Sequence, residues 1–292
     1  MKNKKHVWVA GAMCVLPLMG MAQQTEPLTD SRRLFDDGKE LFLRRDYAAA
    51  QQTLSRFVQQ KPQASLADEA AYMIACTSYE LKSLDCIKQL EGYLEQYPDS
   101  RYANRVQSLI ASAYFFQEKY PEAIACFKGC QFDLLADSER DACTLRMGTA
   151  YLKMGNLQEA AVWFSILKEV SSEYHIDAVY HLAYIDYVQK QYDKALTWFT
   201  RCAESGIRLE NDVVADVYNR MGDCNFYARR FDAADAQYAQ ASGYSMSLSD
   251  YSLFQQSIIK GLQREYGRKI ELLNRLITGF PESQYLDDAL YE

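Results

Sequence analysis

The sequence predicts an all-α fold in which pairs of short helices stack in a row, about seven pairs with part of an eighth. Three observations lead to this prediction. A short apolar pattern recurs at spacings of about 35 to 39 residues, which is typical of a repeat protein. Helix breakers are scarce, with 13 Gly and 6 Pro in 292 residues, while 22 Tyr supply large side chains for packing. Each later copy of the pattern also follows a second helical segment.

The recurring pattern marks the second helix of each pair. It consists of a small residue, an aromatic residue or leucine four positions later, and a third residue three positions after that. The copies are Ala50/Leu54/Phe57, Cys86/Leu90/Tyr93, Ala123/Phe127/Cys130, Ala160/Phe164/Leu167, Ala195/Phe199/Cys202, Ala234/Tyr238/Ala241 and the degenerate Lys269/Leu273/Leu276. The i, i+4, i+7 spacing places all three residues on one helical face.

The first helix of each pair carries a hydrophobic residue followed by a small one. These pairs are Ile110-Ala111, Met147-Gly148, Leu182-Ala183 and Met221-Gly222. A small residue there lets two helices cross closely, because a bulky side chain would force them apart. One such pair of helices cannot bury its own apolar face, so the pairs are expected to stabilise one another by stacking.

These patterns together resemble the tetratricopeptide repeat (TPR), a helix–turn–helix unit of 34 residues. The best copy reads Met147-Gly148, Tyr151, Gly155-Asn156-Leu157, Ala160, Phe164. The resemblance implies a right-handed α-solenoid over residues 31–292. Its repeats are expected near 31–64, 66–100, 102–137, 139–172, 176–208, 213–246 and 250–283, with a partial repeat at 284–292.

The N-terminus has the features of an export signal. Lys2, Lys4 and Lys5 precede a short apolar stretch, and small residues flank a cleavage site after Ala22. We therefore expect residues 1–22 to be a signal peptide, residues 23–30 a linker, and the mature protein to be periplasmic. One alternative, a lipoprotein signal that uses Cys14, is disfavoured because Met13 stands where lipidation needs a small residue and because the cysteine lies inside the apolar stretch. The other alternative is an uncleaved anchor. No further apolar segment of spanning length follows in the sequence.

Charge and composition indicate the class of protein and exclude one class of partner. The chain is 49% hydrophobic and 24% charged, with a mean hydropathy of −0.33, as in folded soluble proteins. Its net charge is −7, and becomes about −10 once the basic signal is removed. Such a surface repels phosphate backbones, so we expect no nucleic-acid partner.

Two connecting segments are near copies of each other, residues 97–103 (Tyr-Pro-Asp-Ser-Arg-Tyr-Ala) and 280–286 (Phe-Pro-Glu-Ser-Gln-Tyr-Leu). In each, proline is expected to end one helix and serine to cap the next. The segments resemble those of TPR proteins of bacterial envelope assembly, which bind other proteins, including members of membrane-associated complexes. The chain stops about one and a half turns into the next predicted helix, so we expect it to be part of a longer protein.

The sequence offers little for catalysis. It contains no G-x-S-x-G elbow, P-loop, dinucleotide fingerprint, H-E-x-x-H motif or EF-hand loop. After signal removal only His175 and His181 remain, six residues apart and far from any cysteine, which disfavours a structural zinc site. We therefore predict a non-enzymatic protein with no cofactor and no metal.

Seven cysteines remain in the predicted mature chain, and four of them stand at the small positions of the repeat. They can replace alanine as small buried residues. The alternative is a disulfide between Cys76 and Cys86, which occupy the two facing positions at the closest crossing of one helical pair. Backbones there approach the distance that a disulfide requires, and a periplasmic protein meets oxidising conditions.

The TPR resemblance also implies a binding surface. Members of the family bind extended or helical peptides on the concave face, which is lined by the first helix of each repeat. The matching candidates here are Phe115, Phe116, Leu152, Tyr180, Tyr184, Tyr187, Asp223, Phe226, Tyr227 and Tyr251. Tyr180, Tyr184 and Tyr187 form one helical stripe of the residue type enriched at binding hot spots. The alternative role for these rings is packing between neighbouring helices.

We therefore predict an exported scaffold that binds a peptide or a partner protein in an aromatic, acidic concave groove. Acidic residues there would steer basic partners toward the groove. The basic clamp with which some family members hold a C-terminal carboxylate is missing, because the matching positions are aromatic or acidic. An alternative from another class is an envelope module that binds glycan or peptidoglycan, with the aromatic stripe stacking on sugar rings.

Overall fold

The computed structural model describes residues 22–60, 64–206 and 210–292, and within them it contains helices and no strand. The helices are α1 (Ala22–Leu43), α2 (Tyr47–Gln59), α3 (Ala64–Glu80), α4 (Cys86–Gln96), α5 (Ala103–Phe116), α6 (Tyr120–Lys128), η1 (Phe132–Leu134), α7 (Asp137–Lys153), α8 (Leu157–Leu167), α9 (His175–Val188), α10 (Tyr192–Ala203), α11 (Asn211–Tyr227), α12 (Phe231–Tyr244), α13 (Ser249–Leu262), α14 (Tyr266–Gly279) and α15 (Leu286–Tyr291). The predicted all-α fold is confirmed.

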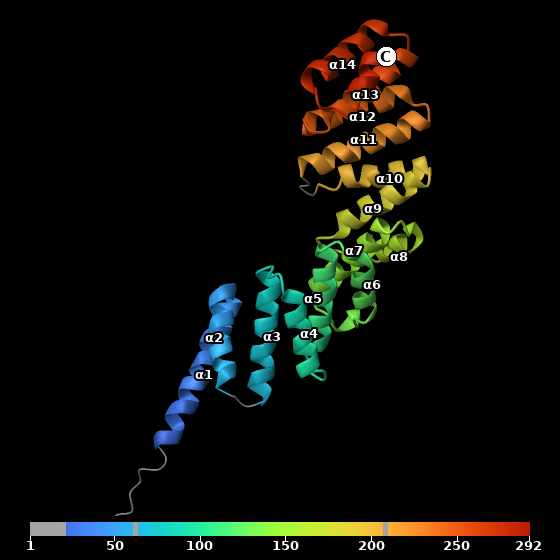
Figure 1. Cartoon of the computed structure of the whole chain (residues 1–292). Coiled ribbons are helices and arrows are strands. Elements are labelled where there is room, and N and C mark those ends of the chain that lie inside the picture. The colour runs from blue at the N-terminus through green and yellow to red at the C-terminus, as the bar shows by residue number, and fades with distance from the viewer. Residues whose placement is uncertain (1–21, 61–63, 207–209) are drawn as a thin grey trace, which may run out of the picture. The chain divides into compact units, whose positions relative to one another are not determined.

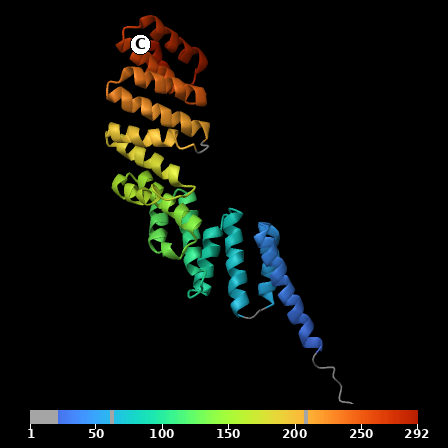
Figure 2. The same ribbon diagram turned by 180° about the vertical axis from the view of Figure 1, so that it is seen from behind.

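The helices alternate along the chain as a first and a second helix of seven pairs, from α1/α2 to α13/α14, with α15 as the start of another (Figure 1). We name the first helix of each pair the A helix and the second the B helix. Each pair overlaps one of the seven repeat ranges that the sequence suggests. The chain forms two compact units, Met1–Leu109 and Ile110–Glu292. In the second unit α11 to α14 lie side by side in both views (Figures 1 and 2).

The predictions for the N-terminus fall partly outside the described residues. Residues 1–21, all of the predicted signal except Ala22, are not described, and Ala22 is the first residue of α1. Residues 23–30, expected as a linker, belong to α1 in the structure. Among the described residues, the helices are all too short or too polar to cross a bilayer.

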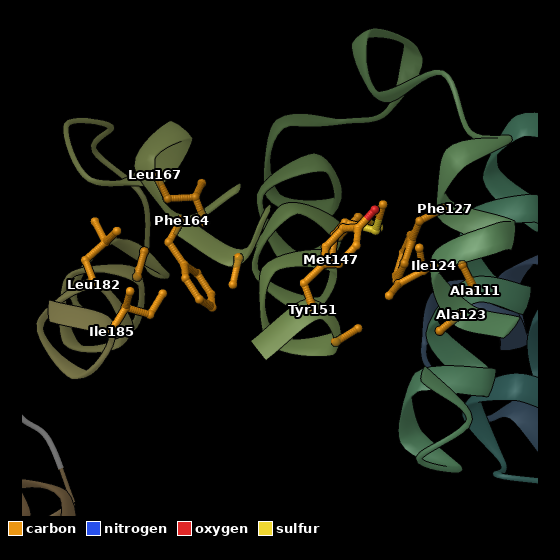
Figure 3. Close-up of a cluster of buried hydrophobic side chains, with 14 of the residues drawn as sticks. Ala111, Ala123, Ile124, Phe127, Met147, Tyr151, Phe164, Leu167, Leu182 and Ile185 are labelled. Atoms are coloured by element: carbon orange, nitrogen blue, oxygen red, sulfur yellow. The ribbon is translucent and has the colours of Figure 1, made fainter. Parts of the chain in front are cut away.

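The interior of the second unit is built from the predicted small and aromatic positions. One core cluster runs from Ala111 to Ile185, and in it Phe127 and Phe164 are fully buried. Figure 3 shows side chains of this cluster from consecutive repeats pointing into a shared interior. The B helix of one pair therefore packs against the A helix of the next, as stacking of incomplete units requires.

Gly148 and Gly222 mark the close crossings of A and B helices. A Cβ atom added to Gly148 would lie 2.7 Å from Cε1 of Phe164, and one added to Gly222 would lie 2.6 Å from Cε1 of Tyr238. The structure thus gives the steric reason for the hydrophobic–small pairs in the sequence. The aromatic ring of the B helix occupies the space that a side chain on the A helix would need.

The turn between the A and B helices of each pair contains one residue with a positive φ, in the left-handed region of backbone conformation. Gly155 fills this position between α7 and α8, with a φ of 76°. The other six turns use a charged residue: Arg45, Lys82, Glu118, Lys190, Arg229 and Arg264, with φ between 51° and 65°. A residue with a Cβ has a steric cost in this region that glycine does not.

Replacing Arg229 with glycine is therefore expected to raise the free energy of unfolding by about 0.5–1 kcal/mol. Arg229 is exposed and has a φ of 58°. Urea denaturation followed by circular dichroism measures the change. Arg229→Ala removes the same charge without relieving the strain, so equal stabilisation by both variants would contradict the argument.

The two similar connecting segments use their serine differently from the prediction. Ser100 accepts a hydrogen bond from the backbone N–H of Tyr102 (3.1 Å) and so closes the turn before α5, rather than capping the helix. Its hydroxyl also contacts the carboxylate of Asp68 at 2.9 Å, on the preceding A helix. Ser283 makes the matching contact with Asp250 at 2.6 Å. The serine therefore ties each segment to the A helix of the repeat before it.

Candidate functional site

The predicted groove residues all lie on A helices of the second unit. Phe115 and Phe116 are on α5, Leu152 on α7, Tyr180, Tyr184 and Tyr187 on α9, Asp223, Phe226 and Tyr227 on α11, and Tyr251 on α13. They fall into two sets. On α5 and α7, Phe115 and Leu152 pack on the Ala111–Ile185 core and Phe116 is exposed, whereas several of the residues on α9, α11 and α13 share a polar network.

Phe116 is the most exposed member of the first set, with 62% of its surface accessible. The guanidinium of Arg146 lies over its ring, 5.1 Å from the centroid, and Arg146 also donates a hydrogen bond to the Ser112 hydroxyl. Phe115 and Leu152 instead pack against the core cluster. Phe116 is therefore an exposed aromatic plate held in place by a cation on the neighbouring A helix.

Asp223 is the centre of the second set. Its carboxylate is almost fully buried, at 3% exposure, and accepts hydrogen bonds from three phenols. Tyr187 on α9 donates at 2.9 Å, Tyr238 on α12 at 2.7 Å and Tyr251 on α13 at 2.5 Å. One aspartate thus joins three successive repeats, and burial together with its negative charge raises the pKa of Tyr238 well above its usual value.

Arg220 compensates the charge of this aspartate. Its guanidinium contacts Asp223 at 3.0 Å and Asp216 at 3.2 Å, and Asp216 also accepts a hydrogen bond from Tyr180 at 2.6 Å. The same guanidinium lies over the rings of Tyr187 and Tyr251, with centroid distances of 5.4 and 5.8 Å. Burial lowers the pKa of Arg220, but the two carboxylates outweigh it and raise the pKa above its ordinary value.

We name these seven residues the tyrosine–aspartate cluster: Tyr180, Tyr187, Asp216, Arg220, Asp223, Tyr238 and Tyr251. The donor and acceptor of both α9–α11 bonds are 36 residues apart, which is one repeat. The cluster therefore uses the hydroxyls of three predicted groove tyrosines within the chain. Their polar tips serve the stacking of repeats, and only the ring surfaces are left for a ligand.

The remaining candidates present aromatic surface. Tyr227 is 56% exposed and stacks on Tyr192, with ring centroids 4.5 Å apart and nearly parallel planes. Tyr184 is partly exposed beside Tyr187, and Phe226 is partly buried against Phe231. The exposed part of the predicted groove consequently contains Phe116, Tyr184 and Tyr227, each supported by an aromatic or cationic neighbour.

His181 makes the stability of this region depend on pH. Burial, with a smaller contribution from Lys153, lowers the pKa of His181 to about 4, and its ring stacks on Phe164 at 4.7 Å. An unfolded histidine titrates near pH 6.5, so between pH 6.5 and 4 the unfolded chain binds a proton that the folded chain excludes.

Stability from this residue is therefore complete above pH 6.5 and is lost as the pH falls toward 4. The slope is at most about 1.4 kcal/mol per pH unit. We expect urea denaturation at pH 7.5, 6.5, 5.5 and 4.5 to show a steeper loss for the wild type than for His181→Gln, which has no imidazole. Parallel profiles would contradict the pKa assignment.

The sequence also suggests tests for a metal site and for a disulfide among the described residues. In the described part of the chain, no group of three or more His, Cys, Asp or Glu side chains could hold a metal ion. Cys76 and Cys86 are both buried, and no disulfide joins the described cysteines. The Cys76–Cys86 bridge stays a prediction. It is checked by counting thiols in denatured, unreduced protein, because a bridge would remove two from the total.

Sequence reasoning missed several residues of this region. Arg220, Asp216 and Tyr238 were not among the candidates, although a signal was present: Asp216 and Asp223 follow Tyr180 and Tyr187 by one repeat length.

Two hollows, of about 650 and 460 Å³, lie elsewhere and share Arg201 of α10. Neither is lined by a predicted groove residue.

Comparison with solved structures shows which known proteins have a similar fold. The C-terminal part of a TPR repeat-containing protein from Cytophaga hutchinsonii aligns with a TM-score of 0.66 and 16% identity, over 88% of this chain and 99% of that one. A TPR protein from Parabacteroides merdae aligns with a TM-score of 0.55 and 15% identity, over 90% and 98%. YrrB, described as a TPR protein with an unusual peptide-binding site, gives 0.53 and 17%, over 69% and 96%. The fold is that of TPR solenoids.

Sequence comparison adds nothing to the structural result. No protein-family model matches the chain. No curated protein matches it either.

Proposed function

We propose that this chain, which has the TPR fold, is a non-catalytic scaffold that binds a peptide or a partner protein on the aromatic face of its A helices. The fold supports an interaction role, since TPR neighbours include YrrB with its peptide-binding site. The partner surface proposed here is centred on Phe116, Tyr184 and Tyr227.

The observation that carries this proposal is that exposed aromatic rings stand on a rigid support. Phe116 and Tyr227 expose more than half of their surface although the core positions of their helices are filled by other residues. The tyrosine–aspartate cluster fixes α9, α11 and α13 to one another. Rings held in place before binding lose little conformational entropy when a partner covers them, so their burial contributes efficiently to affinity.

We further propose that the protein is exported to the periplasm, with cleavage after Ala22. The basic head, apolar stretch and small residues of positions 1–22 support this. N-terminal sequencing of the protein from fractionated bacteria tests it. Mature protein beginning at Gln23 in the periplasmic fraction is expected, and an intact N-terminus in the cytoplasmic fraction would refute it.

Site-specific photocrosslinking tests the binding surface. A benzoylphenylalanine side chain at Tyr227 or Phe116 is expected to form protein adducts in the cell envelope. The matched control is Tyr266 on α14, which is similarly exposed at 60% but lies on a B helix. Equal adducts at Tyr266 and Tyr227 would contradict the proposal. Recovery of glycan or peptidoglycan without protein would favour the alternative function.

A further inference from the structure

The solvent-facing side of α8 is unusually apolar. Val162 and Ile166, one turn apart on α8, are 57% and 51% exposed, and Val170, in the segment that follows the helix, is 38% exposed. The six other repeats have polar or small residues at the positions that match Val162 and Ile166. These are Gln52, Lys88, Ala125, Thr197, Ala236 and Glu271 for the first position, and Arg56, Gly92, Gly129, Arg201, Gln240 and Arg275 for the second. The B helix of this repeat alone carries branched apolar residues at both positions.

Two hollows lie beside α10, and one of them is lined by Val170. Val170 lines the hollow of about 460 Å³ together with Glu169, Glu173 and His175. The neighbouring hollow of about 650 Å³ is lined by α10 residues such as Leu196 and Glu204, and Arg201 borders both. An apolar ridge and two adjoining depressions therefore lie along α8, the segment that follows it, and α10.

Arg201 holds the wall between the hollows in place. Its guanidinium lies 3.4 Å from the carbonyl oxygen of Lys168, 3.4 Å from Nε2 of His175 and 3.6 Å from the carboxylate of Glu169. It also lies over the ring of Trp198, 5.7 Å from the centroid. These contacts fasten residues 168–175 to α10, so the hollows are formed before any ligand arrives.

The charge of the hollows is negative. Glu169, Glu173 and Glu204 line them, and Arg201 is the cation among the lining residues. The ion pair with Glu169 at 3.6 Å offsets that cation, so Glu204 and Glu173, which also interacts with the Tyr174 phenol, give the two hollows together a negative charge. A cationic side chain entering either hollow would gain a carboxylate partner, whereas an anionic one would be repelled.

We propose that this surface, which we name the α8 face, is a second docking site that takes an amphipathic helical segment of a partner protein rich in Lys and Arg. A ridge with a spacing of four residues packs into the groove of another helix, and the partner's apolar residues would cover Val162, Ile166 and Val170. Its basic residues would enter the hollows beside Glu173 and Glu204. The site uses α8, α10 and the segment between α8 and α9, and it shares no residue with the proposed aromatic surface on the A helices.

Two synthetic helices test the chemistry. Both are amidated peptides of 18 residues with leucine at i, i+4 and i+8, flanked by lysine in one and by glutamate in the other. Fluorescence anisotropy with the full chain is expected to show binding of the lysine peptide at least about tenfold tighter than that of the glutamate peptide, and weaker binding at high salt. Equal binding of the two peptides, or no binding of either, would overturn the proposal.

Substitutions locate the site. Val162→Gln with Ile166→Arg copies residues found at the matching positions of repeat one, and because both side chains are exposed the fold should tolerate it. We expect this double variant to weaken lysine-peptide binding about tenfold or more, and Glu173→Lys with Glu204→Lys to do the same. The control, Ala236→Gln with Gln240→Arg, changes the same positions on α12 and should bind like the wild type.

Two results would show that the peptide does not dock on the α8 face as proposed. Loss of lysine-peptide binding in Phe116→Ala/Tyr227→Ala, with full binding in Val162→Gln/Ile166→Arg, would place the peptide on the A-helix face and overturn the α8 proposal while leaving the proposed function intact. Concentration-dependent dimerisation in analytical ultracentrifugation, abolished by Val162→Gln/Ile166→Arg, would identify a second copy of this chain as the occupant and would also overturn it.

Discussion

Replacing Asp223 with alanine is expected to lower the free energy of unfolding by about 3–5 kcal/mol. The carboxylate is buried and accepts hydrogen bonds from Tyr187, Tyr238 and Tyr251, while pairing with Arg220 at 3.0 Å. Alanine would leave three phenols without their acceptor and a buried cation with only Asp216. Urea denaturation of the full chain, followed by circular dichroism, measures the loss.

Two further variants test whether the loss of stability depends on the burial and charge of Asp223, and not simply on the removal of a carboxylate. Asp223→Asn keeps an acceptor oxygen of similar shape and should cost less than Asp223→Ala. Asp232 on α12 is exposed and accepts one hydrogen bond from Gln263, so Asp232→Ala is expected to change stability by no more than about 0.5 kcal/mol. If Asp223→Ala were as mild as Asp232→Ala, the cluster could not be what holds these repeats together.

The Asp223→Ala substitution is also expected to increase hydrogen exchange in particular helices. Solenoid stability is a sum of repeat and interface terms, so damage at one interface is felt first by its neighbours. Hydrogen exchange of Asp223→Ala should speed up in α9, α11 and α13, and much less in α2 to α4. Uniform acceleration along the chain would show that the effect is not carried by these contacts.

Replacing Gly148 with alanine is expected to lower the free energy of unfolding by about 1–3 kcal/mol, although alanine is the better helix former. The added Cβ would lie 2.7, 2.9 and 3.0 Å from three atoms of the Phe164 ring. Phe164 is fully buried among the side chains of the core cluster, so its ring has no room to withdraw. The two helices would have to move apart.

Gly92 provides the matched control. It lies in the middle of α4, it is exposed, and a Cβ added there would meet no atom within 4 Å. Gly92→Ala should therefore raise stability by about 0.5–1 kcal/mol, because it gains helix propensity without a clash. Gly148→Ala should cost less stability in a chain that also carries Phe164→Leu than in the wild type, because the smaller side chain leaves room for the added Cβ. Stabilisation by Gly148→Ala alone would show that the crossing is not sterically limited.

Much of the fold follows from the sequence because it depends on local and periodic information. The small and aromatic positions recur once per repeat, so their spacing alone predicts that residues such as Gly148 and Phe164 meet at a helix crossing. The groove candidates came from the TPR resemblance, and in the structure they lie on A helices. The apolar part of the packing between successive repeats follows from this pattern of about 36 residues.

The roles of polar groups depend on contacts between repeats, and the sequence alone assigned them incompletely. Tyr187 and Tyr251 were predicted for a binding groove, yet both hydroxyls donate to Asp223 inside the stack. Arg220 received no role from the sequence, although it joins two carboxylates and two rings. A hydrogen-bond partner is fixed by the distance and direction between side chains, which residue type and spacing do not determine.

The sequence by itself determined the helical repeat, the positions of close crossing and the residues that fill the interior, since hydrophobic periodicity and residue volume are properties of the chain. Only the tertiary structure decided which tyrosines are tied to Asp223 and which rings stay exposed. It also decided that Val170 borders a hollow held open by Arg201. Those outcomes depend on which side chains of different repeats meet, and that requires the angle and distance at which successive helices pack.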